Sequence, residues 1–121
     1  MAVTYSAGFK NAYVDRVSDG YAGFLFQILD SSNVVLAQGN IPANPHSAAA
    51  GGTASVNTFQ FSVTTTGTAA KFRIFNGSDA DDYKEGTITL SGGGGDMILT
   101  SLSLVEEDSV KINVWDISFP P

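Results

Sequence analysis

The chain of 121 residues has the length of one domain, and its composition excludes several classes of protein. Six Lys and Arg against twelve Asp and Glu give a net charge of −6 without a basic cluster, so binding to nucleic acid or to an anionic membrane surface lacks an electrostatic basis. With no cysteine, there is no disulfide, thiolate nucleophile or thiolate metal site. No apolar run approaches the ~18 residues of a membrane span. The N-terminus shows no signal-peptide pattern, so we expect a soluble protein made in the cytoplasm.

The low charge content suggests that part of the surface is covered by a partner. Only 15% of the residues are charged, whereas about 25% is typical of soluble domains. Contact surfaces between proteins are depleted in Lys, Glu and Asp. We therefore expect a contact surface on this domain.

One short helix is predicted near the N-terminus, over residues 8–20. Its apolar residues recur at three- and four-residue spacing: Phe9, Ala12, Tyr13, Val14 and Val17. Gly20 is a suitable C-terminal stop. So short a helix is marginal alone, and we expect its apolar side to dock on one end or edge of a sheet.

The remainder of the chain predicts about seven short strands separated by turn residues. The alternating segments are residues 22–29, 34–39, 58–64, 69–75, 84–91, 97–105 and 110–119. The turn Asp30–Asn33 predicts a hairpin between the first two of them. Without alternating helices, the pattern indicates a mainly β, single-domain fold over residues 1–121. We expect an antiparallel β-sandwich or a jelly-roll-like barrel.

Aromatic side chains on the inward faces of these strands predict the core. They are Phe24, Phe26, Phe59, Phe61 and Phe72. In the last segment the apolar face changes sides after Val114, because Trp115, Ile117 and Phe119 alternate out of phase with the preceding residues. This change predicts a bulge, or a strand that is buried on both sides near its end.

Two segments are predicted as loops. Residues 41–57 contain two prolines and many small residues without periodicity, so we expect a long loop that is mobile or shaped by a neighbour. In it, His46 is expected to be an exposed loop residue. The four glycines of residues 92–95 precede Asp96, and no lysine follows, which argues against a phosphate-binding loop. We expect a connection between strands in which glycines supply positive φ angles.

No set of residues predicts an enzyme or a cofactor. The one acidic cluster, Asp79, Asp81, Asp82 and Glu85, is a weak candidate for calcium, since it lacks the glycine and glutamate of an EF-hand loop. A solvated acidic tip between two strands is the favoured interpretation. Trp115 and Tyr83 could instead form a sugar-binding face, although for Trp115 we favour the core or a contact between subunits.

Three patterns in the second half of the chain carry a resemblance to a known family. A strand over Gly67–Ile74, the Gly-Thr-Ile strand of Gly86–Ile88 and the segment Gly95–Leu99 precede a final β run. Together they resemble small structural proteins encoded among the virion genes of tailed bacteriophages. The N-terminal helix, hairpin and small-residue loop over residues 9–57 also fit that layout.

The resemblance implies a non-enzymatic capsid cement or decoration protein on the outer surface of the virion. Its implied partners are the phage major capsid protein and further copies of itself in a trimer. We expect the contacts to come from loop-like segments, namely Ala2, Val3, Thr4, Tyr5, Pro42, Asn44, Pro45, His46, Phe119, Pro120 and Pro121. Two alternatives stay open: another virion part in the neck, tail or fibre, and a carbohydrate-binding β-sandwich module.

Overall fold

The computed structural model describes residues 4–76 and 81–118, and it is mainly β with one helix in these ranges. This confirms the predicted fold class. None of the helices in the described part of the chain is long and apolar enough to cross a membrane.

Five strands form the main sheet, in the order β2-β1-β6-β7-β8. Their bounds are β1 Leu25–Leu29, β2 Val35–Asn40, β6 Lys71–Phe75, β7 Tyr83–Thr89 and β8 Met97–Ile98. Three further pairs are antiparallel: β4 (Phe59–Ser62) with β10 (Ser109–Ile112), β5 (Gly67–Thr68) with β9 (Ser103–Leu104), and β3 (Thr53–Ala54) with β11 (Ile117–Ser118). The predicted hairpin is present as β1 and β2, and Asp30 Oδ1 accepts hydrogen bonds from two amides of its turn.

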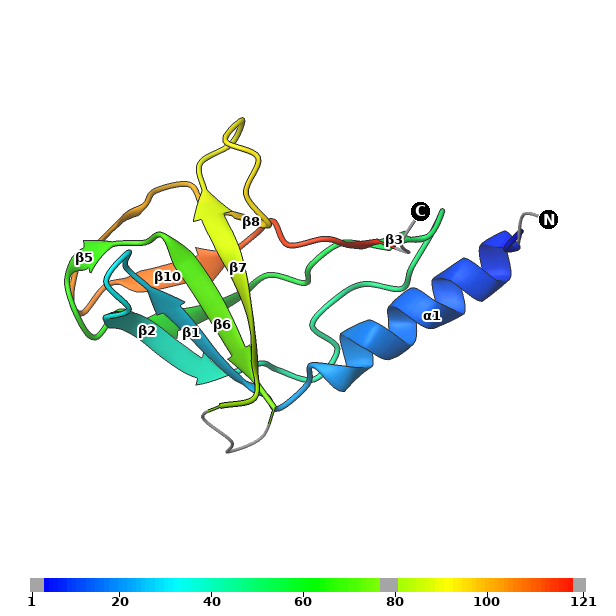
Figure 1. The fold of residues 1–121 in the computed structure, drawn as a ribbon, viewed down its shortest axis with the longest axis horizontal. Coiled ribbons are helices and arrows are strands. Elements are labelled where there is room, and N and C mark those ends of the chain that lie inside the picture. Colours follow the sequence, from blue (N-terminus) through cyan, green and yellow to red (C-terminus); the bar gives the residue numbers. More distant parts are fainter. Residues whose placement is uncertain (1–3, 77–80, 119–121) are drawn as a thin grey trace.

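The β4–β10 ribbon closes the main sheet into a small barrel (Figure 1). A single bridge joins Ala37 of β2 to Val63 beyond β4, and another joins Ile98 of β8 to Val114 beyond β10. The ribbon therefore meets both edges of the sheet. Closure of this kind protects the sheet edges from pairing with other chains. The jelly-roll arrangement stays a prediction.

Aromatic and aliphatic side chains fill the barrel, as the alternation of the strands predicts. Phe26 is fully buried, and its ring lies 5.7 Å from that of Phe72 and 6.2 Å from that of Trp115. Phe59 and Phe61 pack against this cluster and are partly buried. The prediction that Trp115 belongs to the core is confirmed, since it is only 3% exposed. Leu90 has the same phase in the alternating segment 84–91 as the buried Ile88, but it is 47% exposed.

The glycine-rich segment connects β7 to β8, and these two neighbours are parallel. Such a short return needs sharp turns, and Gly92 and Gly94 have φ angles of 89° and 76°. The side chain of Asp96 accepts hydrogen bonds from both the amide and the hydroxyl of Thr87, which ties the loop back to β7. The predicted role as a connection is confirmed. The parallel pairing was not predicted.

Outside the barrel, helix α1 (Ala7–Gly20) lies along residues 41–57, which we call the arm (Figure 1). Ser6 caps the helix by accepting a hydrogen bond from the amide of Phe9. The arm is a narrow hairpin, with bridges between His46 and Val56 and between Ala50 and Thr53. Its far strand, β3, pairs with β11. Helix, arm and β11 together project from the barrel, and we call them the projecting unit.

Candidate interaction surface

Three side chains on one face of α1 form hydrogen bonds to the arm. They are spaced four and three residues apart, so they share that face. Asn11 Oδ1 accepts from the Gly52 amide at 2.9 Å, Asp15 Oδ1 accepts from the Ala49 amide at 2.8 Å, and Ser18 Oγ lies 3.0 Å from His46 Nδ1. The partners on the arm are three residues apart, in the reverse direction. This set of contacts, which we call the polar zipper, fixes the position of the helix on the arm.

His46 is the most buried rung of the polar zipper. Its ring is 6% exposed, lies 4.6 Å from the ring of Trp115, and has Nε2 2.9 Å from the backbone oxygen of Trp115. A carbonyl can only accept, so Nε2 must carry the proton, and Nδ1 accepts from the Ser18 hydroxyl. Burial lowers the pKa of His46 below 6.5, and this effect outweighs the bond to Trp115 and the charge of Asp116, which both raise it.

The prediction that His46 is an exposed loop residue is therefore wrong. The physical reason is that the arm folds back as a hairpin against α1 and the segment around Trp115, which removes the ring from solvent. Pro45 beside it is also fully buried. Both side chains are buried within this chain, so neither can contact a partner as predicted.

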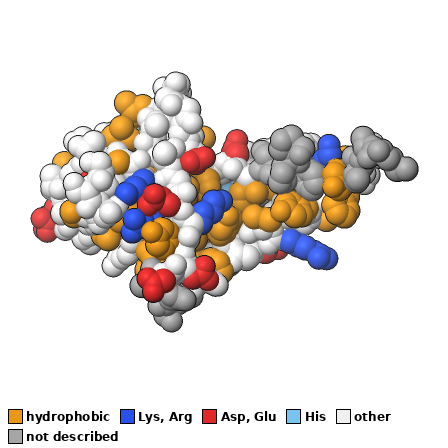
Figure 2. Space-filling view, viewed as in Figure 1, with side chains coloured by type: hydrophobic (Ala, Val, Ile, Leu, Met, Phe, Trp, Pro, Cys, Tyr) orange, Lys and Arg blue, Asp and Glu red, His pale blue; other side chains and the backbone are white. Residues whose placement is uncertain are grey.

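The other side of α1 carries a row of aromatic rings, which we call the aromatic stripe. Phe9 and Tyr13 lie on the helix and Tyr5 directly precedes its N-cap, Ser6. The three residues are spaced four apart and are 46%, 55% and 45% exposed for Tyr5, Phe9 and Tyr13. The rings of Tyr5 and Phe9 stack at 5.5 Å. Hydrophobic side chains are visible along this part of the projecting unit in Figure 2. Next to the stripe, a hollow of about 250 Å³ is lined by Phe9, Ala12, Tyr13 and Arg16.

The apolar spacing of α1 predicts that Phe9 and Tyr13 dock on a sheet, but the helix turns these two rings away from the arm. Only Val14 and Ser18 of the helix are buried, and the face toward the arm is largely polar. Phe9 and Tyr13, predicted to dock on a sheet, are exposed instead. That part of the prediction is wrong, because the small-residue arm offers amides to bind rather than an apolar surface. An exposed group of large apolar side chains on a soluble protein is typical of an interaction site.

The remaining predicted contact residues divide into two groups. Thr4, Tyr5, Pro42 and Asn44 are exposed, and Tyr5 is part of the aromatic stripe. Ala2, Val3, Phe119, Pro120 and Pro121 lie outside the described residues.

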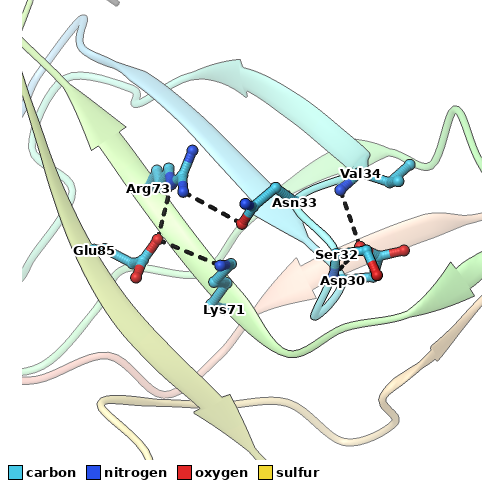
Figure 3. A network of polar contacts seen from close by, with 7 residues as sticks. All are labelled: Asp30, Ser32, Asn33, Val34, Lys71, Arg73 and Glu85. Atoms are coloured by element: carbon cyan, nitrogen blue, oxygen red, sulfur yellow. Dashed lines mark hydrogen bonds and ion pairs between the residues drawn. The ribbon is translucent and has the colours of Figure 1, made fainter. Parts of the chain in front are cut away.

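A second polar network lies on the outer face of the main sheet (Figure 3). Glu85 Oε1 accepts from Arg73 Nε at 2.8 Å and lies 3.6 Å from Lys71 Nζ, while Arg73 also donates to Asn33 Oδ1 at 3.3 Å. The Arg73 bond lowers the pKa of Glu85. The Arg73 guanidinium lies 4.5 Å from the centre of the Tyr83 ring. These exposed pairs across β6 and β7 contribute modestly to the sheet.

The acidic residues do not form a metal site within the described ranges. There, no three or more His, Cys, Asp or Glu side chains gather in a way that could hold an ion. Glu85 is bound to Arg73, and Asp82 Oδ2 accepts from the side-chain Nδ2 of Asn76 at 2.7 Å. Of the other two candidates, Asp81 is exposed and Asp79 lies outside the described residues.

The predicted sugar-binding pair is not brought together. Trp115 is in the core, so its place in a sugar-binding face is wrong. Tyr83 is 43% exposed and borders a hollow of about 200 Å³. That hollow is lined by Tyr21, Phe24, Ile74, Asn76, Asp82, Tyr83 and Lys84. The Lys84 ammonium donates to the Tyr21 hydroxyl at its edge.

The Ser18–His46 pair resembles part of a hydrolase triad but lacks the access that a nucleophile needs. Ser18 is 3% exposed and faces the arm. The second ring nitrogen of His46 binds a backbone carbonyl instead of a carboxylate. The arrangement therefore positions the helix rather than activating a hydroxyl group.

Sequence reasoning missed Asn11, Asp15 and Ser18 as a functional set. A signal was present, because polar residues spaced four and three apart beside Val14 form a stripe of their own. Their partners on the arm are mainly backbone amides, which no side-chain pattern reveals.

Comparisons of the chain with protein-family models, with curated proteins and with solved structures give no match.

Proposed function

We propose that this chain is a non-enzymatic structural protein of a bacteriophage virion, and in the first place a capsid cement protein. The observation that carries the proposal is the aromatic stripe, presented on a helix that stands away from the barrel. The sequence resemblance to small virion proteins supports it independently. The partner is the major capsid protein on the outer shell, where the resemblance also implies self-association into trimers.

The mode of contact is a helix that lies in an apolar groove of the partner. Helices of this kind use anchors at four-residue spacing, as Phe9 and Tyr13 provide, and Tyr5 extends the row just before the N-cap. Aromatic rings are the side chains that most often dominate the energy of an interface. Three half-exposed rings offer roughly 300 Å² of apolar surface, which is below the ~800 Å² that each partner of a stable complex buries.

A small contact of this size suits a repeated lattice. Many copies on one shell act multivalently, so each interface can be modest. A protein that binds the assembled shell and not its dissociated subunits stabilises the shell by mass action.

Copy number in purified particles tests the proposal directly. Gel densitometry of particles from the phage that encodes the chain is expected to give hundreds of copies, or a ratio near one to the major capsid protein. A dozen copies would instead move the protein to the neck, tail or fibre. Absence from the particles would overturn the virion assignment.

The aromatic stripe is tested by the double variant Phe9→Ser and Tyr13→Ser. We expect it to keep the far-ultraviolet circular dichroism of the wild type and to lose at least tenfold in affinity for particles stripped of the chain. The matched control is Leu90→Ser with Val105→Ser, since these apolar side chains on the barrel are also half-exposed. Equal binding by both double variants would remove the stripe from the interface.

A carbohydrate-binding function is the second candidate, and the hollow beside Tyr21 and Tyr83 favours it. Two aromatic rings with an ammonium, an amide and a carboxylate group suit a small polyhydroxyl ligand. Because the Tyr21 ring lies 5.3 Å from that of Trp115, occupation of the hollow should change the fluorescence of the single tryptophan. A titration with oligosaccharides, repeated on Tyr83→Ala, separates this candidate from the first.

A further inference from the structure

We infer that His46 is the positioning residue of the aromatic stripe, and that acidification below neutrality releases α1 from the arm. The geometry carries this inference, since one imidazole joins three segments that are distant in the sequence. They are the C-terminal end of α1 through Ser18, the arm through His46 itself and the β10–β11 connection through Trp115. The inference rests on the proposed function only where it concerns binding of a partner.

With a neutral ring, every hydrogen of the His46–Ser18 pair has an acceptor. Nε2 donates to the Trp115 carbonyl, and Nδ1 accepts from the Ser18 hydroxyl. A second proton would occupy Nδ1 and face the Ser18 oxygen, so the Ser18 hydroxyl proton would have to turn away. The ring would also carry a charge in a site that is 6% exposed, next to the apolar face of Trp115.

The charged groups around the ring do not reverse this preference. On the packed elements, the ionisable side chains are Lys10, Tyr13, Asp15, Arg16 and Asp19 of α1, Tyr21 beside the Trp115 ring, Lys84 bonded to Tyr21, and Asp116 of the C-terminal segment. The arm itself contains no other ionisable residue. Asp116 favours the charged ring, but the effect of burial is larger.

The sign of the pH dependence follows from linkage. The pKa of His46 is lowered in the folded protein, so the released state binds more protons once the pH falls below about 6.5. Acidification therefore favours release of the ring. The stabilisation is complete above this value and decreases from there down to the lowered pKa.

Release of His46 would free α1 at its attachment to the barrel. The remaining rungs, at Asn11 and Asp15, bind backbone amides of the distal half of the arm, and we expect them to open more often once the third rung is lost. Without the third rung, the angle between α1 and the barrel would no longer be fixed. The aromatic stripe would then meet a partner in many orientations, and ordering it would weaken binding.

Hydrogen–deuterium exchange at the Ala49 and Gly52 amides tests the inference, because both donate to α1. Between pH 7.5 and pH 5.5 we expect their protection factors to fall about tenfold in the wild type, while amides of β1 and β6 change little. In His46→Gln, whose amide group can donate to Trp115 and accept from Ser18 at any pH, we expect no such fall. An equal fall in both proteins, or none in the wild type, would falsify the inference.

Two further measurements keep the result interpretable. The single histidine gives one imidazole signal by NMR, and we expect its pKa to lie below 6.5. A pKa of 6.5, together with unchanged protection of the Ala49 and Gly52 amides, would overturn the inference. If His46→Gln does not fold, Ser18→Ala removes the partner of Nδ1 alone. We expect it to lower the protection of both amides at pH 7.5, and an Ser18→Ala protein identical to the wild type would contradict the mechanism.

Binding to stripped particles at both pH values separates this inference from the proposed function. Wild-type binding that weakens severalfold at pH 5.5, with constant binding of His46→Gln, supports both. If no particle binds at any pH but the amides respond, the positioning role stands and the proposed function fails. If the amides respond and binding is constant, the link between positioning and docking is overturned.

Discussion

The barrel and the projecting unit are held together by different interactions. In the barrel, fully buried side chains such as Phe26, Phe72 and Met97 contact one another across the strands. In α1, only Val14 and Ser18 are buried, and three hydrogen bonds to the arm position the helix. The barrel is thus stabilised by apolar burial, whereas the position of α1 depends mainly on polar contacts to the arm.

This difference implies different local stabilities for two regions of one small domain. Regions with few buried apolar contacts open at lower free energy than the core does. The rings that could have anchored α1 to the barrel are instead on its exposed face. We therefore expect α1 to open without unfolding the barrel.

The largest expected effect comes from Phe26→Ala in the barrel. Its ring is fully buried among those of Phe59, Phe61, Phe72 and Trp115, so truncation leaves a cavity at the centre of the core. We expect a loss of about 3–5 kcal/mol in the free energy of unfolding, measured by urea denaturation.

Phe9→Ala is the matched control, since it removes the same atoms from the projecting unit. Phe9 is 55% exposed, so its truncation should change the free energy of unfolding by less than about 0.5 kcal/mol. Similar losses for both variants would show that the two regions are not stabilised differently.

An intermediate effect is expected from Asp15→Ala in the polar zipper. The variant removes the acceptor of the Ala49 amide, and a hydrogen bond to a charged group contributes about 1.5–3 kcal/mol. We expect roughly tenfold lower protection of that amide in hydrogen exchange and a much smaller change in β1. Asp19→Ala, which removes an exposed carboxylate from the same helix, should leave the Ala49 amide protected.

The barrel was largely predictable because its strands obey a local rule. Alternation placed Phe26, Ile28, Phe72 and Ile74 inside, and the turn at Asp30 fixed the first hairpin. The closing bridges at Val63 and Val114 were not predictable, because they depend on pairings between residues distant in the chain.

The projecting unit was not predictable by the same rule. The apolar spacing in α1 predicts that the apolar face docks. In the structure, the face that contacts the arm carries polar side chains that bind arm amides. His46 is buried because the arm, which is rich in small residues, packs closely against α1. Sequence pattern indicates which side chains are apolar, but it does not say whether their partner lies in the same chain.

The smallest expected effect comes from Glu85→Gln on the outer face of the barrel. The carboxylate is exposed and is shared by Arg73 and Lys71, so much of its attraction is screened by solvent. Because the pKa of Glu85 is lowered from 4.5 in the folded protein, its contribution is present above that value and is lost as the pH falls further. We therefore expect Glu85→Gln to cause a small loss of stability that is the same at pH 6 and pH 7 and becomes smaller below pH 4.5. Urea denaturation at pH 4, pH 6 and pH 7 checks this, and a loss that differs between pH 6 and pH 7 would mean that the outer network is coupled to the projecting unit.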